Sequence, residues 1–176
     1  MFTKPLKPAM QQAYVKLMMS VIGNGLVIAS QVDSEIQQEI AKFPENFTLS
    51  MKVFPHGPAF TARVNQLKQL ELVDEPSGKP DLCIIFKHLE HAFLVFSFQE
   101  STARAFANDR MIADGDVSYA IRLVRCLNKM ESLILPKLIA SLAVKQYPEQ
   151  LGFKEKLSNA SLIYLKLAQS FLKRSA

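Results

Sequence analysis

Apolar and polar residues alternate along two neighbouring segments in the first half of the chain. In FTLSMKVF (47–54) every second residue from Phe47 to Val53 is apolar, and FTARVN (60–65) repeats the same period of two. This alternation is typical of strands that bury one face. Because the turn residues PHGP (55–58) separate the two segments, we expect a β-hairpin.

Further strands are predicted on both sides of a loop. QLELV (69–73) is a candidate third strand, and EPSGKP (75–80) is rich in turn residues. DLCIIFK (81–87) is a continuous apolar run of strand length, which indicates a central strand covered on both faces. RMIA (110–113) is predicted as a short strand.

The N-terminal segment has helical signals. Residues 9–22 form a Met-rich helical pattern, which we expect to stop at Gly23-Asn24-Gly25. A second helix is predicted at about 34–43, where Ser34 and Gln37 have capping-box spacing.

Helical periodicity dominates the second half. HLEHAFLVF (88–96) has helical spacing, although LVFSF (94–98) could also alternate as a strand, and 103–107 suggests a short helix. The most regular helix begins at 117, and its predicted core face is Val117, Ala120, Ile121, Val124 and Leu127. Two more helices are predicted at about 133–144 and 158–174.

The order of these elements favours an α+β fold with helices on one face of a mostly antiparallel sheet. A helical segment (1–44), a core (45–130) and C-terminal helices (131–176) are expected to form one compact domain. The 176 residues and the 49% apolar content suit a single globular domain.

The net charge and the positions of the cysteines exclude few functional classes of protein. A net charge of +5 permits attraction to anionic membranes or nucleic acid without requiring either. Cys83 and Cys126 lie inside apolar runs and are predicted to be buried small hydrophobes. No signal-peptide pattern is visible, and the apolar stretch 17–29 is interrupted by glycines and too short to span a bilayer. A cytoplasmic location is therefore expected.

The sequence offers little for catalysis. His88 and His91 could supply two metal ligands, but the HExxH spacing is absent and a third ligand, such as His56, is unmarked. A solvated helix face is the favoured interpretation. No G-x-S-x-G elbow or phosphate-binding loop is present. We therefore expect no cofactor, no metal and no enzymatic activity.

Four arginines in the second half of the chain could form a basic patch that binds nucleic acid. The aromatic residues near them follow core spacing and not that of a stacking platform for bases. We therefore expect a solvated basic face and no nucleic-acid partner. The four arginines concerned are Arg104, Arg110, Arg122 and Arg125.

The stretch RMIADGD (110–116) combines three charges around one glycine. Two carboxylates two residues apart lack a base or a third ligand, so a catalytic or metal site is disfavoured. The stretch is better explained as a strand followed by a turn. Gly115 would take the positive φ of the turn, and Asp116 would cap the helix that begins at Val117.

Aromatic residues are concentrated between 86 and 106, where five Phe residues occur. They could form an ordinary core or line an apolar cavity for a ligand. Periodicity does not separate these two interpretations.

The order of the segments resembles the sterol carrier protein type two family, also called the sterol-binding or lipid-transfer domain. The resemblance covers about 47–128 and departs from the family at Asn108-Asp109, where glycine is usual. It is carried by the two alternating strands, PDLCIIFK, HLEHAF, and AFANDRMIADGD running into VSYAIRLV.

The resemblance implies a curved sheet covered by helices, with an apolar tunnel that holds sterols, fatty acyl chains or other lipids. Carried over by segment, the tunnel would be lined by Phe93, Phe96, Phe106, Met111, Ile121 and Val124.

The expected function is therefore that of a non-catalytic binding or carrier protein for a hydrophobic ligand. The alternative is a non-enzymatic accessory or assembly protein of a lipid or quinone pathway, with a filled cavity. The C-terminal residues Lys166, Lys173 and Arg174 could bring the chain to anionic membranes, or their helix could pack on the domain or on a second copy. The identity of the ligand and the oligomeric state stay open.

Overall fold

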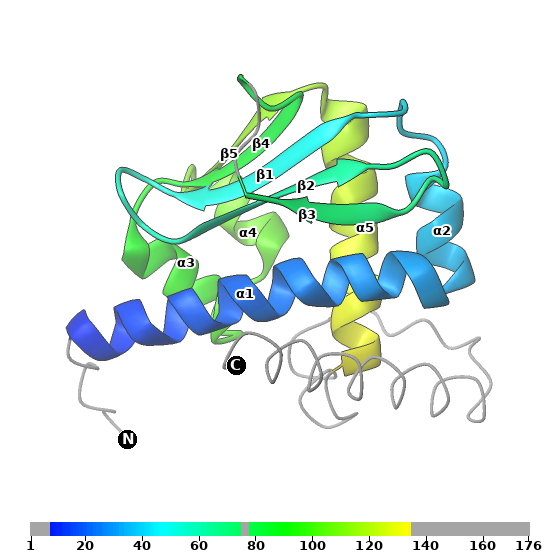
Figure 1. Cartoon of the computed structure of the whole chain (residues 1–176). Helices are drawn as coiled ribbons and strands as arrows, with labels where there is room; N and C mark the ends of the chain where they lie inside the picture. The colour runs from blue at the N-terminus through cyan, green and yellow to red at the C-terminus, as the bar shows by residue number, and fades with distance from the viewer. Residues whose placement is uncertain (1–7, 75–77, 135–176) are drawn as a thin grey trace.

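The computed structural model describes residues 8–74 and 78–134, which form one mixed sheet with helices on one of its faces (Figure 1). The strand order across the sheet is β3-β2-β1-β4-β5. The strands are β1 (Thr48–Val53), β2 (Ala59–Val64), β3 (Leu70–Val73), β4 (Leu82–Phe86) and β5 (Met111–Gly115).

Strand pairing confirms the hairpin and the predicted strands. β1 and β2 are antiparallel, with Met51 opposite Phe60, and β2–β3 and β4–β5 are antiparallel as well. β1 and β4 are parallel, with Met51 opposite Ile84. The expected α+β class with a mostly antiparallel sheet is therefore confirmed, and its centre is one parallel pair.

Helix α1 (Pro8–Val32) corrects the prediction that Gly23-Asn24-Gly25 ends the first helix. The helix continues through this stretch and packs along the sheet. A Cβ atom at position 23 would lie 2.9 Å from Cγ of Phe60, so the close approach of helix and strand requires a glycine there. Packing of α1 on β2 outweighs the cost of about 1 kcal/mol for a glycine inside a helix.

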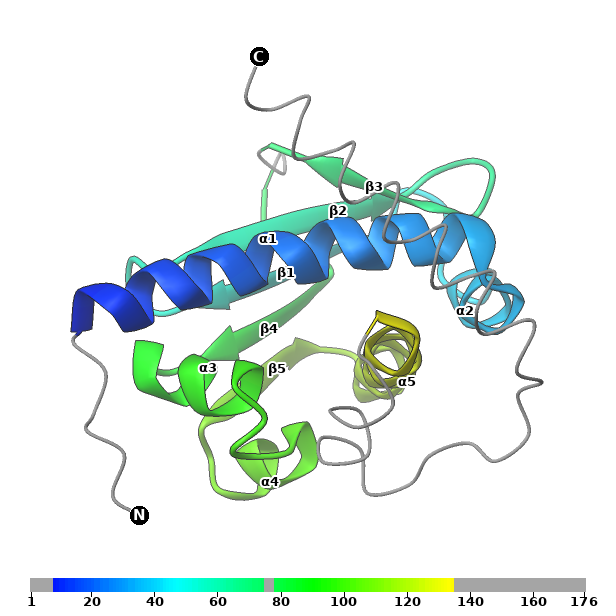
Figure 2. The same cartoon turned by 90° about the horizontal axis from the view of Figure 1, so that it is seen from below.

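The length of α1 also corrects the statement that its apolar stretch is too short to span a bilayer. By length and composition, α1 could cross a membrane, and it lies near the N-terminus. Half of its most apolar window is buried inside the protein, where it crosses the helical face of the sheet (Figure 2). Burial of this kind is what the core helix of a globular fold shows.

Helix α2 (Ser34–Ile40) begins at the residue predicted to be its cap, and its N-cap lies one residue earlier. The N-cap is Asp33 and not Ser34, because Oδ1 of Asp33 accepts hydrogen bonds from the backbone N–H groups of Glu35 (3.1 Å) and Ile36 (3.0 Å). A carboxylate at this position satisfies two free amides and complements the helix dipole.

Helices α3 (Leu89–Phe96), α4 (Thr102–Ala107) and α5 (Val117–Ile134) complete the described part of the chain. The ambiguous segment LVFSF is thus helical up to Phe96. The helices predicted at about 133–144 and 158–174 lie outside the described residues, except where α5 reaches position 134. The division into 1–44, 45–130 and 131–176 stays a prediction.

The buried face of α5 differs from the predicted one. Val117 is 65% exposed and Ile121 is 50% exposed, so neither belongs to the core. The sequence contains two overlapping apolar stripes on this helix, and the one with the larger Leu and Met side chains packs inward. Its buried members are Ala120, Leu123, Cys126, Leu127, Met130 and Leu133.

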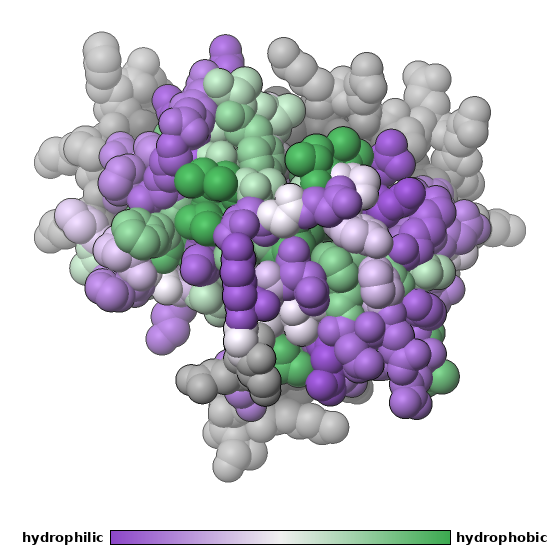
Figure 3. Space-filling view, turned by 90° about the horizontal axis from the view of Figure 1, so that it is seen from above, coloured by the Kyte–Doolittle hydropathy of each residue, from purple (hydrophilic) through white to green (hydrophobic). Residues whose placement is uncertain are grey.

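The core lies between the sheet and the helices. Leu49, Val64, Leu82 and Phe86 on the inner face of the sheet are almost fully buried. All the described helices lie on one side of the sheet (Figure 1), yet β4 is largely buried on both faces, as predicted, since Cys83 on the other face is only 4% exposed. The opposite face is mainly hydrophilic with separate hydrophobic patches (Figure 3).

β5 runs two residues beyond the strand predicted at 110–113 and ends at Gly115, which pairs with Leu82 of β4, but the predicted positive φ and the predicted helix cap are both present. Gly115 has a φ of 139°, and Oδ1 of Asp116 accepts a hydrogen bond of 2.7 Å from the backbone N–H of Ser118 at the start of α5. The hydrogen bonds of the Ser118 side chain and backbone hold the pKa of Asp116 below its ordinary value. Asp116 is therefore a capping residue.

Asp116→Ala is expected to cause a small loss of stability and no change in ligand binding, because the cap is remote from the cleft described below. The folded-state pKa of Asp116 is lowered, so its contribution is present above the unfolded pKa and disappears as the pH falls through the folded one. Thermal melts should therefore separate variant and wild type at neutral pH and converge in acid. A loss of binding at unchanged melting temperature would contradict the capping role.

Candidate ligand-binding cleft

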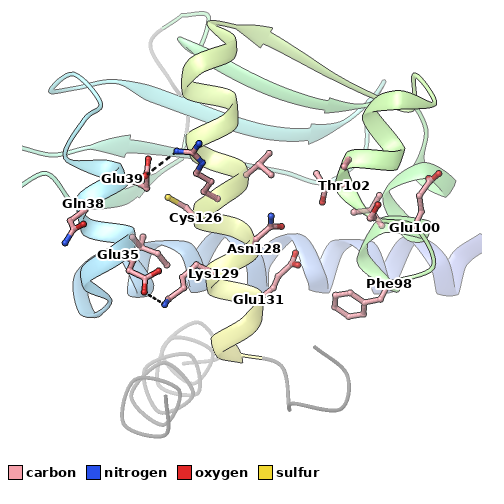
Figure 4. A pocket seen from close by; sticks show the side chains of 16 residues that line it. Glu35, Gln38, Glu39, Phe98, Glu100, Thr102, Cys126, Asn128, Lys129 and Glu131 are labelled. Atoms are coloured by element: carbon pink, nitrogen blue, oxygen red, sulfur yellow. Dashed lines mark ion pairs between the residues drawn. The ribbon is translucent and has the colours of Figure 1, made fainter. Parts of the chain in front are cut away.

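A cleft of about 720 Å³ lies around α5, between α2 on one side and the α3–α4 region on the other (Figure 4). Pockets of roughly 300–1,000 Å³ hold small molecules of drug size. α2 contributes Glu35, Ile36, Gln38 and Glu39. The α3–α4 region contributes Val95, Phe98 and residues 100–103, and α5 contributes Val124, Arg125, Cys126, Asn128, Lys129 and Glu131.

Ion pairs tie α2 to α5 along one wall of the cleft. Glu39 lies 2.8 Å from Nη1 of Arg122 and 3.7 Å from Nη1 of Arg125, and Glu35 lies 2.7 Å from Nζ of Lys129. The three basic residues are three and four positions apart on α5, so they share one side of the helix. Each charged group of this wall has a partner of opposite charge within the protein, with Glu39 shared by two arginines.

Arg122 and Arg125 belong to the predicted basic face, and both are paired with Glu39. Burial alone would raise the pKa of Glu39, but its hydrogen bond with Arg122 and the positive charges of Lys42 and Arg122 hold it below its ordinary value. Arg110 likewise pairs with Glu100 at 3.0 Å. These arginines hold helices and loops together.

The opposite wall is a polar network beside apolar side chains. Glu100 is buried and accepts hydrogen bonds from Nδ2 of Asn108 (2.8 Å) and Nη1 of Arg110 (3.0 Å). Oγ of Ser101 accepts from the backbone N–H of Arg104 and caps α4. These bonds fix the connection that carries Phe98.

Phe98 has an unusual backbone conformation for an aromatic residue. Its φ is 60°, in the left-handed region that bulky side chains rarely adopt. This conformation comes directly after α3 and places Phe98 where it lines two cavities. Such outliers concentrate at functional sites, because the surrounding structure must hold them in place.

The second cavity is a small apolar pocket of about 30 Å³ beneath the cleft. α1 contributes Met18, Val21 and Ile22 to its lining, and the remaining residues are Phe96, Phe98, Met130 and Glu131. Phe98 and Glu131 line both cavities, so the two meet at these side chains.

Glu131 is the carboxylate at this junction. Burial raises the pKa of its carboxyl to about 7. Among residues 8–74 and 78–134 no side chain or backbone group forms an ion pair or hydrogen bond with it. In Figure 4 it lies on the side of α5 away from Lys129.

Two of the six predicted tunnel residues border a cavity. Val124 lines the cleft, and Phe96 lines the small pocket. The structure places the other four elsewhere: Phe93 packs edge-on against Tyr14, Phe106 is half-buried against the core, Met111 is buried in β5, and Ile121 is on the exposed side of α5. Their role as ligand contacts stays a prediction.

The aromatic segment is mainly core. Phe86 is buried and meets Phe96 in an edge-to-face contact with ring centroids 5.2 Å apart. Of these five phenylalanines, Phe96 and Phe98 line the two cavities described above. Phe98 and Glu131 were missed, because their positions depend on a loop conformation and on the rotation of α5.

The other candidate groups are explained by packing. Cys83 and Cys126 are free and buried, as predicted, and burial raises the pKa of the Cys126 thiol to about 12. The rings of His88 and His91 meet edge-on at 5.1 Å, and burial lowers the pKa of His91. Within the described part of the chain, no three His, Cys, Asp or Glu side chains are grouped as metal ligands.

No protein-family model matches the chain, and no curated protein matches it. Solved structures do match the chain, and sterol carrier protein 2 domains are among them.

Three of these structures show the extent of the likeness. A ubiquinone synthesis protein, UbiJ-SCP2, is 14% identical, with 72% of this chain and 100% of that chain covered and a TM-score of 0.44. Sterol carrier protein 2 from Yarrowia lipolytica is 18% identical (65% and 89% covered, TM-score 0.42). The sterol carrier protein domain 2 of Helicoverpa armigera is 19% identical (67% and 85% covered, TM-score 0.41).

Proposed function

We propose that the protein binds and carries a hydrophobic small molecule with a polar end, without catalysing a reaction. The observation that carries the proposal is the cleft of about 720 Å³, which meets an apolar pocket at Phe98 and Glu131. The ionic groups of the α2–α5 wall are engaged with one another, and the high pKa of Cys126 keeps its thiol protonated. These features favour binding over chemistry.

The lining suits an amphiphile. Val95, Phe98 and Val124 offer apolar contact, while Thr102 and Asn128 offer hydrogen-bonding groups. Burying about 300 Å² of apolar ligand surface would contribute about 7 kcal/mol before the cost of association. A long hydrocarbon body could therefore bind without a charged anchor.

Val124→Trp is expected to block the cleft and to weaken binding of an NBD-labelled long-chain alcohol at least about ten-fold, because the indole would occupy the ligand's volume. The matched control is Val117→Trp on the exposed start of the same helix, which should bind like the wild type. Fluorescence titration of the full chain measures affinity, and thermal melts verify folding. Equal affinities of both variants would place the ligand elsewhere.

Lipid extraction and native mass spectrometry of the purified protein provide the direct test. Co-purifying lipid supports the carrier. If the wild type carried no lipid and bound no probe, the carrier function would be rejected.

One observation favours the alternative of an accessory or assembly protein of a lipid or quinone pathway. The inner face of the sheet is tightly packed against α1 and α5, and the small pocket holds only about 30 Å³. This alternative predicts that Val124→Trp leaves the protein's role intact. The cytoplasmic location and contact with anionic membranes also remain proposals, and Lys166, Lys173 and Arg174 lie outside the described residues.

A further inference from the structure

Glu131 differs from the other carboxylates of the cleft in having no partner. Glu35 pairs with Lys129, Glu39 pairs with Arg122, and Glu100 accepts from Arg110 and Asn108. Within 8–74 and 78–134 nothing is bonded to Glu131. The Glu131 side chain is partly buried where it lines both cavities, so a ligand group that supplies the missing hydrogen bond there would be bound favourably.

The surroundings of Glu131 are known for each described element that borders the junction. α1 presents only apolar side chains there, namely Met18, Val21 and Ile22. From α3 and the α3–α4 connection, Phe96 and Phe98 border the pocket, and Glu100, which lines the cleft, is paired with Arg110. From α5 and α2, Lys129 and Glu35 are paired with each other on the other side of the helix (Figure 4).

The charge of the cleft disfavours an anionic ligand. Four acidic and two basic side chains line it, and both basic ones face acidic partners on α2. A full positive charge on the ligand is disfavoured for another reason, because it would lose its hydration beside the apolar side chains of α1. An uncharged hydrogen-bonding group suffers neither penalty.

We propose that Glu131 anchors the polar end of the ligand, and that it selects amphiphiles with an uncharged hydroxyl or carbonyl group over anionic ones. The apolar body would then lie along Val95, Phe98 and Val124. This assignment deepens the proposed carrier function and rests on it. Burial supports it, because a carboxyl with a pKa of about 7 is partly protonated at neutral pH and then both donates and accepts a hydrogen bond.

The test uses the full chain and three NBD-labelled probes with the same alkyl body: an alcohol, a carboxylic acid and a primary amine. At neutral pH the wild type is expected to bind the alcohol about ten-fold more tightly than the acid or the amine. Between about pH 6 and about pH 8 its affinity for the acid should fall further, because Glu131 becomes ionised.

Two variants of Glu131 separate the contribution of its hydrogen bond to ligand binding from that of its negative charge. Glu131→Leu should lose about ten-fold in affinity for the alcohol. Glu131→Gln should keep the alcohol within about three-fold and make binding of the acid independent of pH over this range. Glu45→Gln removes one exposed carboxylate outside the cleft and should behave like the wild type.

Folding of the variants is verified separately. Glu131→Leu should melt at or above the wild-type temperature, because it removes a partly buried acid that has no partner among the described residues. Wild-type stability should also fall relative to Glu131→Gln as the pH rises from about 5 to about 8, since the folded state holds the proton more tightly than the unfolded state.

The outcomes distinguish the anchor from the carrier function. If Glu131→Leu bound all three probes like the wild type, or if the wild type preferred the acid or the amine, the anchor would be rejected and the carrier function would stand. If the wild type bound no probe and carried no lipid, both would be rejected.

Discussion

Gly115→Ala is expected to lower the free energy of unfolding by about 3–5 kcal/mol, the largest effect of any exposed position described above. Gly115 has a φ of 139°, which L-residues rarely adopt. A Cβ atom there would also lie 2.5 Å from the carbonyl oxygen of Asp81 and 3.1 Å from Cα of Leu82. Both obstacles are backbone atoms of the neighbouring β4 region, so no side chain can rotate away.

Urea denaturation of the purified variant measures this loss. The control is Gly78→Ala, because Gly78 also has a positive φ, 121°, but a Cβ atom added to it would meet nothing within 4 Å. Its substitution should cost only the conformational penalty, about 1–2 kcal/mol. If both substitutions destabilised the protein equally, the close approach of β5 to β4 would be irrelevant.

Phe86→Ala is expected to cost about 3–5 kcal/mol, as deletion of a fully buried aromatic side chain does. Phe86 is only 1% exposed and contacts the ring of Phe96, which lines the small pocket. The cavity left in β4 would therefore lie directly behind a wall of that pocket. We expect probe affinity to change together with stability.

The matched control is Phe54→Ala, since Phe54 follows β1 and is 58% exposed. Its removal should change the free energy of unfolding by less than about 1 kcal/mol. Denaturation curves and probe titrations on both variants test the prediction. Similar losses at the two positions would mean that Phe86 is not part of the core.

Much of the fold could be predicted from local sequence patterns. Period-two alternation located β1 and β2, and the turn residues between them determined their pairing. Asp116 was recognised as a cap because capping is a local interaction between a side chain and the next amides. Gly23 was misjudged for the opposite reason, since its role depends on the ring of Phe60, which is 37 positions away in the sequence.

Less of the candidate site could be predicted from the sequence. On α5, two apolar stripes overlap, and only packing against the sheet decides that Leu123 faces inward while Ile121 faces out. In the sequence, Glu131 looks like any helical acid near Lys129. Its distinction is that Lys129 is paired with Glu35 of α2, and this depends on how two helices meet.

The parallel pairing of β1 with β4 has a consequence for synthesis on the ribosome. β1 and β2 can pair soon after they emerge, but the other edge of β1 has no partner until Leu82–Phe86 has been made. An unpaired edge of an alternating apolar strand invites association with other chains. The nascent protein is therefore expected to need a chaperone most while residues between the hairpin and β4 are being translated.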